Sequence, residues 1–316
     1  MEQNGINVAD TNSGLARGTL IAYGAGYFAS NLCWTFVGGY LTIFYTDILG
    51  IAPAMVSLLL LVARVFDGFW DPAFGAIAER TKSRWGRFRP YIMFGAPALA
   101  IFSTLTFTKI GSGNITVIAA FVTYFICGLM YSVVNMSYGS LSTVMTSNQD
   151  SLMQLNSYRM LGSNISTLLL NALTPTLLLA LSRNGKLDAH GYMMTALVFA
   201  CCALPLFYLV AFKCHENIRP DRAETNVPLR KTLRVVLTNK PLMTLFVLQL
   251  IAMTAMFGCF GVLAYYVMYD FKRFDLLAWF MTLPSVGSVF GILLTKNYVT
   301  KVGRKKMMAI GYIGSG

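Results

Sequence analysis

The sequence predicts an all-α membrane protein whose helices cross the bilayer many times. Of its 316 residues, 56% are hydrophobic and only 12% are charged, and the mean hydropathy is +0.59. Soluble domains carry about 25% charged residues, so half that share leaves too little polar surface to coat a water-soluble globule. The apolar residues also form long continuous runs, which are typical of membrane helices and not of the alternating strands of a closed barrel.

Nine apolar runs predict the membrane helices, because a helix needs about 20 apolar residues to cross the hydrocarbon core. We expect eight complete helices and the start of a ninth near residue 306, which is cut off at Gly316. The eight predicted ranges are 19–45, 54–78, 90–108, 115–139, 158–182, 191–213, 241–267 and 275–296.

One long polar segment divides these helices into two groups. Residues 214–240 contain Pro220, Pro228 and charges of both signs, which is typical of a linker. We therefore expect a six-helix transmembrane bundle over 1–213, a cytoplasmic linker loop over 214–240, and a partial second bundle over 241–316. The second bundle would hold helices 7, 8 and the start of 9.

The positive charges of the loops predict the orientation. Loops after the predicted helices 2, 6 and 8 carry most of the lysines and arginines, so these loops and the N-terminus are expected in the cytoplasm. Two of these loops, at 83–89 and 301–306, are tight basic turns with a glycine at matching positions, as in transporters built from repeated halves. This clustering explains the net charge of +12 by contact with a lipid bilayer. Nucleic acid is not an expected partner, because no aromatic and basic groove motif is present.

Acidic side chains inside the second predicted helix indicate a cation site. Asp67 and Asp71 are four residues apart, which places both carboxylates on one helix face, and Arg64 lies on nearly the same face. A charge at the centre of a membrane helix costs roughly 2.5–3.5 kcal/mol, so such groups need a partner. Two carboxylates in a low dielectric repel each other, and a monovalent cation or a proton relieves that repulsion. An Arg64–Asp67 ion pair that only assists insertion is the alternative, but it does not explain Asp71.

Pro72 predicts a further oxygen ligand between these two carboxylates. Proline has no backbone N–H, so the carbonyl of Gly68, one turn earlier, loses its hydrogen-bond donor. We hypothesise that this carbonyl could serve the same cation.

Polar and aromatic side chains of the first and fifth predicted helices are candidates for a substrate site. Tyr23, Tyr27, Asn31 and Trp34 follow an i, i+4, i+8, i+11 series and line one stripe of the first helix. Such a stripe suits a sugar, but packing between helices would also produce it. A transmembrane Asn is more often a contact between helices than a ligand contact. Arg159 opens the fifth predicted helix, so its side chain could simply extend to the cytoplasmic surface.

Two motifs resemble one transporter family. Residues 64–72 (RVFDGFWDP) and the basic turn at 80–90 (RTKSRWGRFRP) resemble the glycoside–pentoside–hexuronide:cation symporters, a melibiose permease-like family of the major facilitator superfamily. Segments 23–26 and 131–141 are similar to this family too. The resemblance runs from about residue 18 to the end of the chain.

The resemblance implies a major facilitator-type transporter of two bundles and twelve helices, of which this chain would hold the complete N-terminal six-helix bundle and part of the second. It implies alternating access, in which a small glycoside, pentoside or uronide moves together with Na⁺, Li⁺ or H⁺. No cofactor besides the coupling cation and no enzymatic activity are expected. A multi-pass protein of the bacterial inner membrane is implied, and we expect a monomer.

The resemblance also assigns roles to single residues. Its cation site maps to Asp67, Asp71, Ser132 and Asn135, and a Na⁺ ion there would be the only metal. Its substrate site maps to Tyr27, Asn31, Asn135 and Arg159. The cytoplasmic loop that is expected to take part in gating holds Arg84, Gly86, Arg87 and Arg89.

Two departures from the family bear on the substrate. Asn31 and Asn135 stand where melibiose permease has aspartates, and Gly139 replaces a tryptophan. The site thereby loses two negative charges and keeps Arg159. This combination suits a sugar with an anionic group, as in the glucuronide-type branch.

Three other functions are alternatives to sugar symport. One is a proton-coupled exporter of a non-sugar solute, which would use the same carboxylates. Another is a membrane enzyme or receptor, but no Ser/His/Asp constellation is present and the six cysteines lack metal-finger spacing. The third is a truncated fragment that does not transport.

Overall fold

A computed structural model describes residues 15–81, 83–183, 186–218 and 238–269, and the single positions 287 and 291. The chain divides into two compact units, Met1–Arg219 and Pro220–Gly316, and the division falls inside the predicted linker. The helices predicted at 275–296 and from residue 306 lie outside the described residues.

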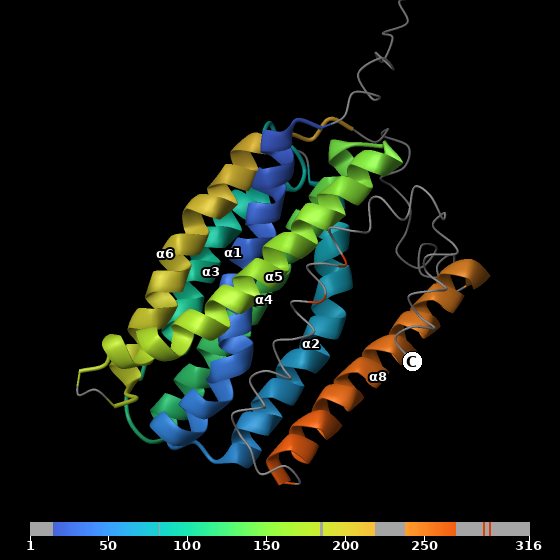
Figure 1. Cartoon of the computed structure of the whole chain (residues 1–316). Helices are drawn as coiled ribbons and strands as arrows, with labels where there is room; N and C mark the ends of the chain where they lie inside the picture. Colours follow the sequence, from blue (N-terminus) through green and yellow to red (C-terminus); the bar gives the residue numbers. More distant parts are fainter. Residues whose placement is uncertain are drawn as a thin grey trace, which may run out of the picture. The chain divides into compact units, whose positions relative to one another are not determined.

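The described residues form α-helices and one π-helical turn (Figure 1). In the first unit these are α1 (Arg17–Ile43), η2 (Phe44–Ile48), α2 (Pro53–Arg80), α3 (Arg89–Thr106), α4 (Asn114–Met145), α5 (Gln149–Ala180) and α6 (Ala189–Lys213). In the second unit α8 spans Lys240–Tyr269 and begins after Asn239, whose side chain accepts a hydrogen bond from the Leu242 N–H. Each of the seven predicted helices within the described residues is confirmed, and the π-helical turn was not predicted.

Among the described residues, the four helices α2, α4, α5 and α6 are long and apolar enough to cross a membrane by length and composition. Their first turns follow from local chemistry. Pro53 starts α2, where its missing N–H needs no partner. The Asp188 carboxylate caps α6 by accepting a hydrogen bond from the Gly191 N–H at 2.7 Å.

The helices α4 and α5 extend further than predicted, and they are separated by only three residues. We predicted an end at 139 and a start at 158, because hydropathy falls there. The start of α5 at Gln149 follows from the Asn148 side chain, which caps the helix by accepting hydrogen bonds from the Asp150 and Ser151 N–H groups at 2.8 and 3.4 Å. Arg159 therefore lies ten residues inside α5 and does not open it, which corrects the sequence-based interpretation.

Within the first unit, α1 packs between α5 and α6, α3 packs on α4 and α6, and α2 packs mainly on α4 (Figure 1). Glycines bring α1 and α5 into backbone contact. A Cβ atom at Gly162 would clash with the Gly24 carbonyl oxygen, and one at Gly24 would lie 2.8 Å from the Tyr158 carbonyl oxygen. Such close approach is typical of helices that associate in membranes. It fixes the position of α1 against α5.

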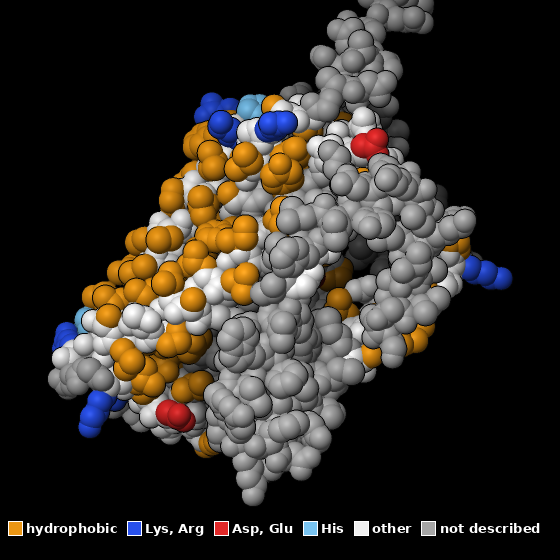
Figure 2. All heavy atoms as spheres, in the orientation of Figure 1, with side chains coloured by type: hydrophobic (Ala, Val, Ile, Leu, Met, Phe, Trp, Pro, Cys, Tyr) orange, Lys and Arg blue, Asp and Glu red, His pale blue; other side chains and the backbone are white. Residues whose placement is uncertain are grey.

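One end of this unit, which we call the basic end, joins the starts of α1, α3 and α5 to the ends of α2, α4 and α6. Its exposed or half-buried cations are Arg17, Arg80, Arg84, Arg87, Arg89 and Lys213. Figure 2 shows blue Lys and Arg side chains at this end, above a surface that is mostly hydrophobic. The opposite end is called the distal end below.

Candidate functional site

The predicted stripe of α1 faces the neighbouring helices. Tyr23 stacks on Tyr138 of α4 at 4.5 Å between ring centres, and each hydroxyl donates to the backbone carbonyl of the other. Trp34 stacks on Tyr131 of α4 at 4.0 Å. Asn31 is engaged by α5, because its Nδ2 donates to the Ser163 Oγ at 2.7 Å and the Ser163 carbonyl at 3.2 Å.

Two arginines lie against the aromatic rings of this stripe. The Arg159 guanidinium lies 4.5 Å from the ring centre of Tyr27 and 6.0 Å from that of Tyr138. The Arg64 guanidinium of α2 lies 5.3 Å from the ring of Trp34. Such contacts hold a cation without neutralising it. Arg159 is half-buried, and among the described residues no carboxylate forms an ion pair with it.

The two aspartates of α2 differ in their partners. Arg64 Nη1 lies 3.6 Å from Asp67 Oδ2, so the ion pair considered above as an alternative is present. The buried Oδ1 of Asp71 has no hydrogen-bond partner among the described residues. An unsatisfied buried acceptor costs about 1–3 kcal/mol, and more when it is charged. Asp71 is therefore the carboxylate that still needs a ligand.

The register of α2 against α4 shows what lies beside Asp71. It follows from two contacts between these parallel helices: a Cβ at Gly128 would lie 3.9 Å from Asp67 Oδ1, and a Cβ at Gly75 would lie 3.5 Å from Met136 Cε. Halfway between these contacts, Asp71 is level with Ser132, which is buried. Asn135 is one turn further, and its buried Oδ1 also lacks a hydrogen-bond partner among the described residues.

The predicted cation ligands thus come from two helices that pack on each other. Asp71, Ser132 and Asn135 offer carboxylate, hydroxyl and amide oxygens, which are ligands for small hard cations. At Gly68 a side chain would meet no atom within 4 Å.

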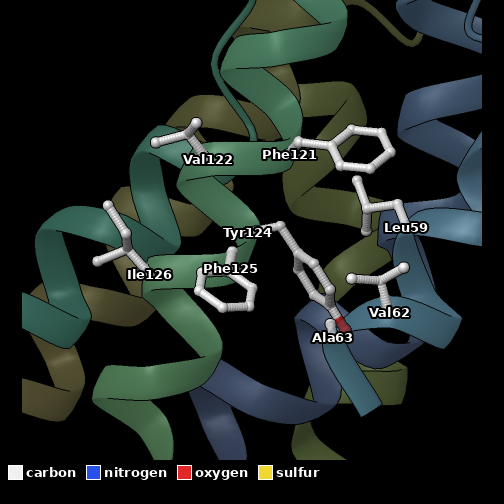
Figure 3. A pocket seen from close by; sticks show the side chains of 8 residues that line it. All are labelled: Leu59, Val62, Ala63, Phe121, Val122, Tyr124, Phe125 and Ile126. Atoms are coloured by element: carbon white, nitrogen blue, oxygen red, sulfur yellow. The ribbon is translucent and has the colours of Figure 1, made fainter. Parts of the chain in front are cut away.

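An apolar groove of about 270 Å³ lies between α2 and α4 (Figure 3). Its wall on α2 ends at Ala63, next to Arg64, and Figure 3 shows the ring of Tyr124 reaching across from α4 toward Ala63. The other lining residues carry only hydrocarbon. The groove therefore presents a sugar with almost no hydrogen-bond partners.

The loop predicted to take part in gating is held by the carboxylate of Glu216, a residue that follows α6 in the sequence. Glu216 accepts hydrogen bonds from the N–H groups of Arg87 at 2.7 Å, Phe88 at 2.8 Å and Arg89 at 3.2 Å. This carboxylate satisfies the free donors at the start of α3. Gly86 is required here, because its φ is +111° and a Cβ would lie 2.5 Å from Glu216 Oε1.

Residues 214–218, which we call the strap, also bind the end of α4. The Asn217 and Ile218 N–H groups donate to the Val144 carbonyl at 3.0 and 2.9 Å, and Asn217 Nδ2 donates to the Met145 carbonyl at 3.1 Å. The first residues of the predicted linker thus pack on the first bundle. Arg89 adds a hydrogen bond from its Nε to the Ala211 carbonyl at 2.6 Å. The Arg84 side chain is exposed and lies 4.9 Å from the Trp85 ring, outside these contacts.

Several partners of the predicted residues were missed by the sequence analysis. Glu216, Ser163, Tyr131 and Tyr138 were not selected as partners, although each contacts a selected residue or segment. The two tyrosines are seven residues apart on α4, a spacing that places them on one helix face. This spacing could have identified the two tyrosines from the sequence. No pattern in the sequence identifies Glu216 or Ser163 as a partner.

Known proteins resemble the chain over most of its length. The model of a family described as MFS/sugar transport protein matches residues 22–314. The chain is 30% identical over 291 residues to the uncharacterized symporter YnaJ of Bacillus subtilis, covering 91% of the chain and 62% of that protein. It is 28% identical to the isoprimeverose transporter of Lactiplantibacillus pentosus, with 92% and 61% covered, and 30% identical to the glucuronide carrier protein homolog of Escherichia coli, with 95% and 65% covered. The chain spans about three fifths of the length of these relatives.

Proposed function

This chain belongs to the MFS/sugar transport protein family, and from that premise we propose that it is part of a symporter that carries a sugar and a cation together by alternating access. It is a multi-pass membrane protein of a transporter family and not an enzyme. We place the basic end in the cytoplasm, because the positive-inside rule assigns the cation-rich loops to that side.

The unpartnered Oδ1 of Asp71 carries the proposal for cation coupling. Asp67 already faces the Arg64 guanidinium, whereas no described cation pairs with Asp71, so Asp71 is the carboxylate that can take a small cation as its ligand. The nearby oxygens of Ser132 and Asn135 would complete the ligand set for Na⁺ or Li⁺, whereas a proton would need Asp71 alone. Asp67, paired with Arg64, would adjust the charge of the site.

Arg159 supports a substrate with an anionic group, such as a uronide. Its guanidinium is held on Tyr27 and Tyr138, and no described carboxylate neutralises it. A guanidinium binds a carboxylate or a sulfonate through two parallel hydrogen bonds. The names of the relatives include such substrates: besides the glucuronide carrier homolog, the putative sulfoquinovose importer of Salmonella typhimurium is 30% identical over 92% of the chain.

Uptake into membrane vesicles that contain the whole protein tests symport. A panel of neutral glycosides and uronides is measured with and without Na⁺ or Li⁺ and across pH. We expect uronide accumulation that one of these cations drives. Asp67→Asn should reduce the cation stimulation more than the sugar affinity, and equal loss of both would mean that Asp67 has only a structural role.

Arg159→Gln tests the substrate class in the same vesicles. Its KM for a uronide should rise about tenfold or more, while its KM for a neutral glycoside changes little, because a charge-assisted hydrogen bond is lost. Arg183→Gln, at an exposed position of the distal end, is the matched control. An equal effect on both sugars would exclude recognition of an anionic group.

Export is the second candidate. The putative 2,3-dihydroxypropane-1-sulfonate exporter of Salmonella typhimurium is 27% identical over 93% of the chain. Inverted and right-side-out vesicles under the same cation gradient would distinguish the two directions.

A further inference from the structure

Two cations, Arg17 and Lys213, stand at the first residue of α1 and the last residue of α6, at the basic end. A Cβ atom at Gly18 would lie 3.9 Å from Lys213 Nζ, so the ammonium of α6 lies beside the first turn of α1. Arg17 precedes Gly18, and both cations are exposed. Cys214 Sγ lies 4.0 Å from the Thr19 carbonyl oxygen, which confirms that the two helix ends adjoin.

An apolar strip begins next to these cations. Ile21 is one turn into α1 and is 58% exposed, while Phe212 of α6 is 59% exposed and Leu209, one turn before Lys213, is 36% exposed. Figure 2 shows blue Lys and Arg side chains above an orange apolar surface at the basic end. The surface thus combines positive charge at the membrane boundary with hydrocarbon directly below it.

Arg17 and Lys213 have no carboxylate partner among the described residues. Two cations at neighbouring helix ends that no described carboxylate neutralises attract an anion, and phosphate is well suited to hydrogen bonds from guanidinium and ammonium groups. A free anion would leave the apolar strip exposed. A lipid acyl chain would cover Ile21 and Phe212 while its head group binds the cations.

We propose that the seam of α1 and α6 at the basic end binds one phospholipid with an anionic head group. Arg17 and Lys213 hold the phosphate, and an acyl chain lies along Ile21, Leu209 and Phe212. This site uses neither Asp71 nor Arg159, so it does not depend on the proposed transport function.

Native mass spectrometry of the whole protein in detergent tests this site. Phosphatidylglycerol and phosphatidylethanolamine with identical acyl chains are titrated separately. We expect the anionic lipid to bind about tenfold more tightly in the wild type. The double variant Arg17→Gln/Lys213→Gln should bind both lipids alike, since each cation near an anionic lipid contributes severalfold to the affinity.

Lys109→Gln/Lys186→Gln is the matched control, because it removes two exposed lysines near the distal end. It should leave the lipid preference unchanged. Equal loss of this preference in both double variants, or no preference in the wild type, would overturn the proposal.

Ile21→Ser/Phe212→Ser tests the apolar strip and should weaken the binding of both lipids. If inorganic phosphate alone stabilises the protein and these two substitutions have no effect on lipid binding, the site holds a free anion and not a lipid.

Discussion

The strap and the interface of α2 with α4 both place side-chain oxygens inside the first unit. The two regions differ in whether those oxygens have hydrogen-bond partners. At the strap, one Glu216 carboxylate accepts three backbone N–H groups. Between α2 and α4, the buried oxygens of Asp71 and Asn135 have no partner among the described residues.

This difference separates a structural role from a binding role. A satisfied carboxylate stabilises the fold, and removing it leaves donors without acceptors. A buried carboxylate without a partner destabilises the protein when no ligand is bound. A ligand that pairs with this carboxylate removes that cost, and the free energy of binding becomes more favourable by the same amount. The strap should therefore govern stability, and the α2–α4 oxygens should govern ligand binding.

The largest expected effect is that of Asp71→Asn on transport. Loss of the carboxylate should lower cation-driven accumulation about 100-fold, near the upper limit of typical coupling between two sites, while exchange of substrate without net cation movement persists. Uptake and counterflow in vesicles measure these two activities. The melting temperature should stay the same or rise, and a fall of several degrees would contradict the assignment.

Glu216→Ala should have the next largest effect, and the effect is on stability. Three N–H donors at the start of α3 lose their acceptor, so the free energy of unfolding should fall by about 2 kcal/mol. Thermal unfolding of the purified protein measures it. Glu79→Ala, which removes the same charge from an exposed position near the end of α2, should change little. Equal melting temperatures for the two variants would show that the strap is not structural.

A double-mutant cycle between Asn31 and Ser163 sharpens the comparison inside the membrane. Asn31 is a predicted substrate residue whose Nδ2 is already bonded to Ser163. We expect Asn31→Ala and Ser163→Ala to be coupled by about 1 kcal/mol in stability, as for other hydrogen bonds between membrane helices. If the two substitutions show no coupling in stability and Asn31→Ala raises the KM for the substrate, Asn31 binds the substrate and is not a contact between helices.

The smallest effect concerns pH and Asp188. Hydrogen bonds from the Gly191 and then the Arg183 N–H hold the pKa of Asp188 below its ordinary value. This lowered pKa contributes stability above the ordinary value of about 4, and that stability is lost as the pH falls through the folded-state pKa. The contribution is at most about 0.5 kcal/mol, because the group is screened by solvent. Between pH 6 and 3, the melting temperature of the wild type should fall slightly more than that of Asp188→Asn, and parallel curves would contradict the cap.

Hydropathy alone predicted the helices within the described residues, because spanning a bilayer demands long apolar runs. It failed at the end of α4 and at the start of α5, where the helices continue beyond the apolar runs and the Asn148 cap sets the start of α5. The π-helical turn at Phe44–Ile48 has no periodic signal that could have predicted it.

The candidate site was only partly predictable. Spacing along one helix placed Asp67 and Asp71 on one face and gave an Arg64–Asp67 ion pair as an alternative, but it could not show that this pair forms or that a buried oxygen of Asp71 has no partner among the described residues. The Asn31–Ser163 contact joins residues 132 positions apart, and Glu216 reaches Arg87 across 129 positions. Pairings between such distant residues depend on the helix packing, which periodicity within one segment does not encode.

Equilibrium substrate binding to the purified whole protein, measured while Na⁺ concentration and pH are varied, tests the role of the free Asp71 oxygen most directly. In the wild type, one of the two ions should tighten the binding of substrate severalfold, whereas Asp71→Asn should bind substrate with an affinity that neither ion alters. If the asparagine variant keeps the full ion dependence, the coupling ion is held elsewhere and the account of the α2–α4 interface is wrong.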